Sequence, residues 1–410
     1  MIEKSNLQMS QQNPFIGFVL GISKIFFLLM LFAILFLILP FLLPDTFEYG
    51  SLGSLGDTFG GFVNPIVAIV AALLTFLAFY VQYLANQKIQ EQFLAQQSSD
   101  HFYKMLDIHI KNVEAFEIKT KNVVSKGNQW FKINVEGTYE DSQFLIETAL
   151  QRVLTSSKLT QFSLVFGENN FDKDETIYVK GRRCFLLMIK DLHFTLQAVH
   201  IANNTLKEIK ISKDKANELA YKIFFWGTDS EYVSHTDNGN KGEKEIVRRL
   251  NWIRISLRSS EKAKVNFNHK TESTNKVQYF QFIPFSGHSS RLAHYYRHLY
   301  QMVKQLHFSF QNGAIDEIQL FRNLDTLRAQ LSNEEQLLLY YNFRIGFGGR
   351  WDYRKDWKEE NRSDYQFLTK YRMIHNIPLY NTISDKVEPP LNCFDVFIKD
   401  NPNFDLFEWK

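Results

Sequence analysis

The chain has little cysteine, little proline and almost no excess of charge of either sign. Among its 410 residues there are two cysteines, Cys184 and Cys393, and nine prolines. Two cysteines cannot form a disulfide framework or a cysteine-based zinc site, so most of the chain is expected in a reducing compartment. The 47 basic and 44 acidic residues leave a formal charge of +3, which argues against an obligate nucleic-acid coat.

Hydrophobic residues are abundant but unevenly distributed. They make up 45% of the chain, and the 38 phenylalanines are typical of a folded, core-forming protein rather than a disordered one. The mean hydropathy of −0.24 suggests a soluble protein. This average conceals two long apolar runs within the first 84 residues, which we therefore treat separately from the rest.

The first apolar run, IFFLLMLFAILFLILPFLL at residues 25–43, has no charged or hydrogen-bonding side chain. As a helix it would be about 28 Å long, which matches the hydrocarbon core of a bilayer. A buried soluble helix or a cleaved signal sequence is the alternative. A signal sequence has a shorter apolar region that ends in small residues, whereas Pro44 and Asp45 follow here. The sequence therefore predicts a first transmembrane helix.

The second apolar run, PIVAIVAALLTFLAFYVQYL at residues 65–84, predicts a second transmembrane helix. Asn64 suits an N-cap and Pro65 the first helical position. Small residues follow one side of this helix: Ala68, Ala72 and Thr75, or alternatively Ala71, Thr75 and Ala78. Such a face lets helices approach closely in lipid, either within the hairpin or in self-association.

Flanking charges predict the topology of this hairpin. Lys4 and Lys24 precede the first run and Lys88 follows the second, whereas residues 44–64 between them contain no lysine or arginine. By the positive-inside rule, residues 1–24 and everything after residue 84 are expected in the cytoplasm. Residues 44–64 form the predicted external loop.

The remainder predicts a mostly α protein: a helical stalk at 85–118, an α-rich cytoplasmic domain at 119–350 and an irregular C-terminal tail at 351–410. The closing FDLFEW is expected to dock onto the body. The polar stretch 227–276, with a turn signal at Asp237–Asn240, suggests a loop or a subdomain boundary. Ser332 and Glu335 have the spacing of a capping box. Amphipathic helical patterns occur at 141–157, 179–209, 213–226, 287–307, 315–331 and 332–345.

The densest group of candidate functional residues lies in Gly287–Lys304, which contains Arg291, His294, Arg297 and His298. His294 and His298 have the spacing of metalloprotease zinc ligands, but that mechanism needs a glutamate directly after the first histidine, and Tyr295 stands there. We therefore predict no metal site. No motif indicates a cofactor either.

Arg291 and His298 also fit the Arg-x(4–6)-His spacing of HEPN ribonucleases, although Leu292 replaces the polar residue usual after the arginine. The alternative is a helix whose arginine and histidine side chains bind carboxylates, backbone carbonyls or a regulatory ligand. Two further segments could bind phosphate or have no binding role. Lys180–Arg183 suits either a phosphate site or a solvated helix start, and Gly346–Arg350 lacks the Lys-Ser/Thr of a P-loop.

Taken together, several segments resemble the phage abortive-infection family of AbiC type. The stretches that carry the resemblance are Gly56–Gly61 leading through Asn64, Gly181–Arg182 with Phe185, Ile223–Phe225 with Gly227, Ser290–Gln301, and Leu327–Asn342. In that family's pattern the motif residues are Arg291, His294, Arg297, His298, Arg328, Gln330 and Asn342. The segment Pro65–Ala78 departs from the family pattern, and the tail does not align.

The resemblance implies a membrane-tethered effector of bacterial antiviral defence, located in the inner membrane, that arrests or kills the infected cell. Effectors that accompany retrons are similar, which implies a reverse transcriptase and its RNA–DNA product as a restraining partner. The expected partners are thus the lipid bilayer, further copies of the chain and such a sensor, without sequence-specific nucleic-acid binding. The leading hypothesis is disruption of the inner membrane. A membrane-tethered HEPN-like ribonuclease and a non-catalytic receptor or tether are the alternatives.

Overall fold

The computed structural model describes residues 52–121, 154, 162–166, 176–207, 209–234, 240–262, 276–280, 282–353, 365–377, 379 and 384–408, with isolated helical positions at 21, 24, 27, 28 and 31. The predicted first span and the predicted helix at 141–157 lie almost entirely outside these residues. The chain divides into two units, residues 1–90 and 91–410, which are described separately.

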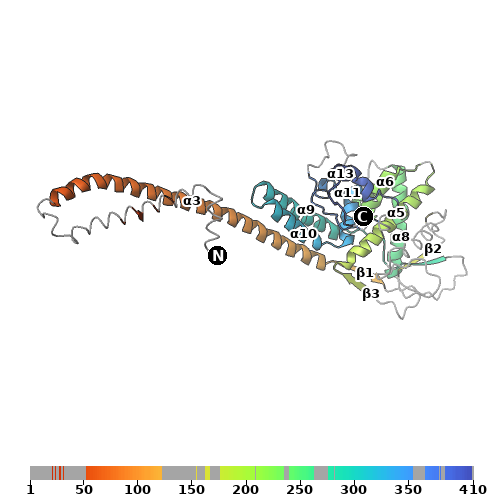
Figure 1. Cartoon of the computed structure of the whole chain (residues 1–410). Helices are drawn as coiled ribbons and strands as arrows, with labels where there is room; N and C mark the ends of the chain where they lie inside the picture. Colours follow the sequence, from red (N-terminus) through yellow and green to blue (C-terminus); the bar gives the residue numbers. More distant parts are fainter. Residues whose placement is uncertain are drawn as a thin grey trace. The chain divides into compact units, whose positions relative to one another are not determined.

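Helix α3 runs without interruption from Leu52 to Glu114 (Figure 1). It begins twelve residues before Asn64, so the predicted helix start at Asn64–Pro65 is wrong, and Pro65 lies inside the helix. A proline in a helix removes a single backbone hydrogen bond, so the turns on either side can continue. The predicted continuation of the second apolar run into a helical stalk is confirmed.

The body is mostly helical, as predicted, and is organised around α5, Arg183–Thr205. Helices α6 (Lys213–Trp226), α8 (Lys241–Lys262) and α11 (Asn333–Ile345) all contact α5. Nearly every α5 side chain from Cys184 to Val199 is buried. Because α5 is buried on nearly all sides, including polar residues such as Asp191 and Gln197, it lies at the centre of a layer of other helices.

Two long helices of the family-like region pack against each other and then lead into α11. They are α9, Ser289–Gln311, and α10, Glu317–Ala329. The predicted capping box at the start of α11 is confirmed. The Glu335 backbone N–H donates to Ser332 Oγ at 3.2 Å, and the Ser332 N–H donates to Glu335 Oε2 at 2.7 Å. After α11 come the 3-10 helix η4, Gly349–Trp351, and the tail.

The described part of the chain contains four short strands that the helical pattern did not predict. β1 (Glu117–Lys121) pairs antiparallel with β3 (Thr176–Lys180), and β2 (Phe162–Phe166) pairs in parallel with β4 (Lys276–Phe280). Each five-residue strand depends on a partner 55 or more positions away, so no local pattern marks it. β3 also takes Lys180 out of the helix predicted at 179–209. α5 starts only after the turn at Gly181, whose φ of +61° favours glycine.

The predicted loop at 227–276 contains α7 (Glu231–Ser234) and α8, so that prediction is wrong. α8 has low average hydrophobicity, but Ile246, Leu250, Ile253 and Leu257 recur at helical spacing and are buried.

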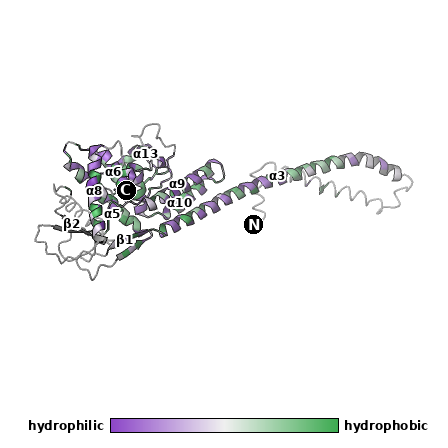
Figure 2. Ribbon diagram, turned by 180° about the vertical axis from the view of Figure 1, so that it is seen from behind, coloured by the Kyte–Doolittle hydropathy of each residue, from purple (hydrophilic) through white to green (hydrophobic). Residues whose placement is uncertain are grey.

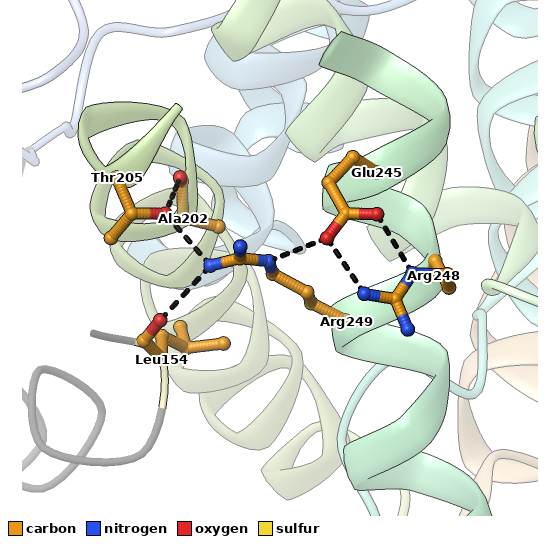
Figure 3. Close-up of polar contacts among 6 residues, drawn as sticks. All are labelled: Leu154, Ala202, Thr205, Glu245, Arg248 and Arg249. Atoms are coloured by element: carbon orange, nitrogen blue, oxygen red, sulfur yellow. Dashed lines mark hydrogen bonds and ion pairs between the residues drawn. The ribbon is translucent and has the colours of Figure 1, made fainter. Parts of the chain in front are cut away.

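Arg249 of α8 secures this helix to α5 (Figure 3). Its guanidinium donates to Glu245 Oε1 at 2.9 Å, to Thr205 Oγ1 at 2.8 Å and to the Leu154 carbonyl at 3.2 Å. The hydrogen bonds from Arg248 and then Arg249 lower the pKa of Glu245 to about 2. Three segments of the chain thus meet at one guanidinium.

The C-terminal residues that the structure describes cover the body. They include two short helices, α12 (Pro390–Cys393) and α13 (Asp395–Asp400), within a tail predicted to be irregular. Leu406 and Phe407 are buried, which confirms the predicted docking of the closing segment. His375 Nδ1 lies 2.8 Å from the Leu406 carbonyl, and the Glu408 N–H donates to the His375 carbonyl.

Candidate functional site

The first candidate site is the apolar part of α3. The helix from Val67 to Glu114 contains an 18-residue window of high mean hydropathy in which no residue is buried. Ile69, Leu73 and Phe76 are 62–68% exposed, and Figure 2 shows hydrophobic residues along this part of the helix. Residues 67–84 would cover about 27 Å as a helix. A continuous exposed apolar surface of this length suits a lipid or protein partner rather than water.

Ala68, Ala72 and Thr75 are all exposed on α3. The Thr75 hydroxyl donates to the Ala71 carbonyl within the same helix at 2.8 Å. This bond satisfies the hydroxyl without a partner helix, so the threonine acts on this face as one more small residue. The predicted association face is therefore geometrically open.

The second candidate site is a histidine pair where the C-terminal part of α3 meets α9, within the second unit. The rings of His109 and His298 stack with centroids 5.8 Å apart, and the His109 ring lies 5.1 Å from Tyr295. His109 is buried, and its Nε2 and the Nδ1 of His298 have no hydrogen-bond partner. Burial, followed by the charges of His298 and Arg182, lowers the pKa of His109 to about 4, and burial lowers that of His298.

Around this pair, tyrosine, glutamate and arginine side chains link α9 to the starts of α5 and α11. The Tyr295 hydroxyl donates to Glu335 Oε1 at 3.1 Å, and burial raises the pKa of Glu335. Arg182, directly before α5, donates to the Gln330 carbonyl at 2.7 Å. The Glu335 carboxyl group therefore both caps α11 and anchors α9.

Arg291 and His298 lie two helical turns apart on α9; His298 contacts the C-terminal part of α3, and Arg291 contacts β1, the strand that follows it. Arg291 Nη2 donates to the Glu117 carbonyl at 2.6 Å, while His298 stacks on His109. The contact of Arg291 with a backbone carbonyl is of the kind that the alternative to a ribonuclease motif expects, whereas the described contact of His298 is ring stacking. Together they bind α9 to the C-terminal end of the stalk and the strand that follows it.

The other predicted motif residues are dispersed. His294 and Arg297 are exposed on α9. Arg328 pairs with Asp325 and donates to the Arg372 carbonyl, which ties α10 to the tail. Asn342 Oδ1 accepts from the Tyr221 hydroxyl at 2.9 Å. In the part of the chain that the structure describes, no group of three or more metal-ligating side chains is present.

Sequence reasoning missed a second buried polar pair at the start of α9. His288 Nε2 lies 2.9 Å from Asp191 Oδ2 in the middle of α5. Gly287 makes this possible, because a Cβ there would lie 2.6 Å from the Trp226 carbonyl carbon and its φ is +83°. The partners come from elements about 100 positions apart, so the sequence offered no signal for this pair.

Comparison with known families supports a role in defence. Residues 287–382 match the family model described as putative phage abortive infection protein. The match contains Arg291, His298 and Asn342, and it confirms the resemblance over this segment. It does not include Gly56–Gly61 or Gly181–Arg182, and it continues beyond residue 350 into the tail. No curated protein and no solved structure matches the chain.

Proposed function

From this family match and the exposed apolar turns of α3, we propose that the chain is a membrane-anchored effector of bacterial abortive infection. It arrests or kills the infected cell by making the inner membrane leaky. The observation that carries the proposal is the apolar surface of α3 between Val67 and Leu84, which nothing in the described residues covers. In water such a surface is unstable, whereas a bilayer covers it.

A single two-helix hairpin cannot enclose a pore, so leakage requires several copies. The face formed by Ala68, Ala72 and Thr75 suits close helix–helix contact. α3 is one helix from Leu52 to Glu114, and its C-terminal turns are held in the body by Phe102, Leu106 and His109. A change in this packing would act directly on the helix that carries the apolar face.

We further propose that a partner restrains the resting state. The resemblance to retron effectors implies a reverse transcriptase with its RNA–DNA product in this role. A partner that binds the resting body better than the active one would shift the equilibrium toward the resting state by that difference in affinity. Copurification of a tagged chain with the reverse transcriptase before infection, and its loss afterwards, is the expected result.

The leak is tested by following membrane potential with a dye in infected cells, alongside total RNA integrity. We expect early loss of potential with intact RNA. The variant Ala68→Leu/Ala72→Leu should delay depolarisation, because the larger side chains keep neighbouring helices from approaching closely. Val70→Leu, on the opposite side of the helix, is the matched control and should behave like the wild type. Cleaved RNA with maintained potential would instead favour the ribonuclease alternative and overturn the leak.

A further inference from the structure

A cleft of about 480 Å³ lies between α6, the end of α11 and residues 386–388 of the tail. Its volume falls within the range of about 300–1,000 Å³ that is typical of small-molecule sites. The cleft belongs wholly to the body and is separate from the histidine pair. Its α11 side, Arg344 to Phe347, lies inside the segment that matches the defence family.

Basic side chains from three parts of the chain converge on this cleft: Lys213 and Lys222 of α6, Arg344 of α11 and Lys386 of the tail. Of the three carboxylates in the lining, Glu388 is held by Arg344 at 2.8 Å. Asp214 and Glu218 also line the cleft and are exposed to solvent. Within the described ranges, Lys213 and Lys222 form no ion pair, so their ammonium groups are available to an anion.

An aromatic side chain stands beside these cations. Phe347 is half exposed on the wall of the cleft. Asn342 fixes its position, because Asn342 Oδ1 accepts from the Phe347 N–H at 3.3 Å and its carbonyl accepts from the Gly348 N–H at 2.8 Å. A Cβ at Gly346 would lie 2.4 Å from the Tyr221 ring. Gly346 thus allows the loop to pack closely, and the Phe347 ring rests against Tyr221 and Phe225 while half of the side chain stays exposed.

We propose that this cleft binds a nucleotide. Lys213 and Lys222 contact the phosphates as mobile point charges, and the base stacks on Phe347. A free nucleotide and the 5′-phosphorylated end of a nucleic acid share this chemistry. The proposal goes beyond the membrane leak and stands without it, because binding is measured on purified protein and requires no change in membrane permeability.

The test is calorimetric titration of the full-length chain in lipid nanodiscs with ATP, with pyrophosphate and with a 5′-phosphorylated dinucleotide. The double variant Lys213→Glu/Lys222→Glu should weaken ATP binding at least tenfold. Lys215→Glu on the same helix lies outside the cleft lining and should leave binding unchanged. The neutral variant Lys213→Gln/Lys222→Gln is used if the charge reversal alters the thermal unfolding midpoint, and it should also weaken binding.

Phe347→Ala separates base recognition from simple anion binding. It should weaken binding of ATP and leave that of pyrophosphate unchanged. Tighter binding of the dinucleotide than of ATP assigns the cleft to a nucleic-acid end, and the reverse assigns it to a free nucleotide. No binding of any probe at millimolar concentration overturns the proposal. Equal loss in Lys215→Glu overturns it as well, and equal binding of ATP and pyrophosphate with a silent Phe347→Ala shows an adventitious ion only.

Discussion

Among the residues that the structure describes, two helices, α3 and α5, are long and apolar enough to cross a membrane, yet the structure surrounds them in opposite ways. The apolar window of α3 has none of its residues buried, whereas 83% of that of α5 is buried under other helices. Length and composition alone cannot separate these cases. The difference lies in whether other parts of the chain cover the apolar surface, as for α5, or leave it exposed to a lipid or protein partner, as for α3.

The largest expected effect comes from placing charge on α3. In a fusion of alkaline phosphatase after Leu84, the wild type should be inactive because the reporter stays in the cytoplasm. The double variant Leu73→Arg/Phe76→Arg should raise the free energy of inserting this helix into the bilayer by about 5–7 kcal/mol, since each arginine lies near mid-bilayer depth. Only the predicted first span would then insert, and the reporter should become external and active. Leu73→Phe/Phe76→Leu keeps the segment apolar and should remain inactive. Phosphatase activity in the wild type would contradict the two-span topology.

Truncation within α5 should instead affect the stability of the body. Leu192 is fully buried, so Leu192→Ala should lower the unfolding free energy by about 2–5 kcal/mol. Leu73→Ala on exposed α3 should change it by less than about 0.5 kcal/mol. Thermal unfolding of the full-length chain in detergent measures both. Similar losses of unfolding free energy in the two variants would contradict the difference in burial between α3 and α5.

The histidine pair tests the region where α3 itself becomes buried. The lowered pKa of His109 means that below its ordinary value of 6.5 the unfolded chain binds the proton more tightly than the folded one. Stability should therefore fall by roughly 2–3 kcal/mol between pH 6.5 and pH 4. His109→Phe should remove the His109 contribution and leave that of His193, whose pKa burial also lowers to about 4, so the fall of the unfolding midpoint with falling pH should become smaller. His101→Phe, exposed on the same helix, should retain it.

A smaller effect is expected where α8 secures α5. Folding lowers the pKa of Glu245 from its ordinary value of 4.5 to about 2. The ionised carboxylate therefore stabilises the folded state above pH 4.5, and this stabilisation is lost as the pH falls toward 2. Glu245→Gln should cost about 1–2 kcal/mol at pH 7 and less at pH 3. Chemical unfolding at the two pH values measures the difference. Glu243→Gln on the same helix serves as the control. If both variants changed the pH dependence of the unfolding free energy equally, the Glu245 hydrogen bonds would not be its cause.

Local patterns predicted the helices well where a cap or an apolar period was strong. The capping box of α11 and the boundaries of α6 could be read from neighbouring residues because their causes are local. The sequence did not predict α8, because its row of buried apolar residues is narrow and lies among many charged residues. Strands β1 and β4 were not predicted either, because the strands that they pair with are distant in the sequence.

The candidate site was predicted only in part, for a related reason. The Arg291–His298 spacing drew attention to two residues that lie two turns apart on α9. It could not show that Glu117 and His109 would contact these two residues, since Glu117 and His109 come from a different part of the chain. The sequence likewise offered Gly346–Arg350 as a weak nucleotide signal but not the lysines of α6 that face it.

What the sequence alone determined is the uncharged apolar character of residues 65–84, their continuation as a helical stalk, the mostly helical body and the resemblance to a defence family. Only the tertiary structure decided which apolar helix is covered, which histidines meet and which cations share a cleft. Composition and periodicity are properties of neighbouring residues. Burial, pKa and recognition depend instead on atoms that folding brings together from distant parts of the chain.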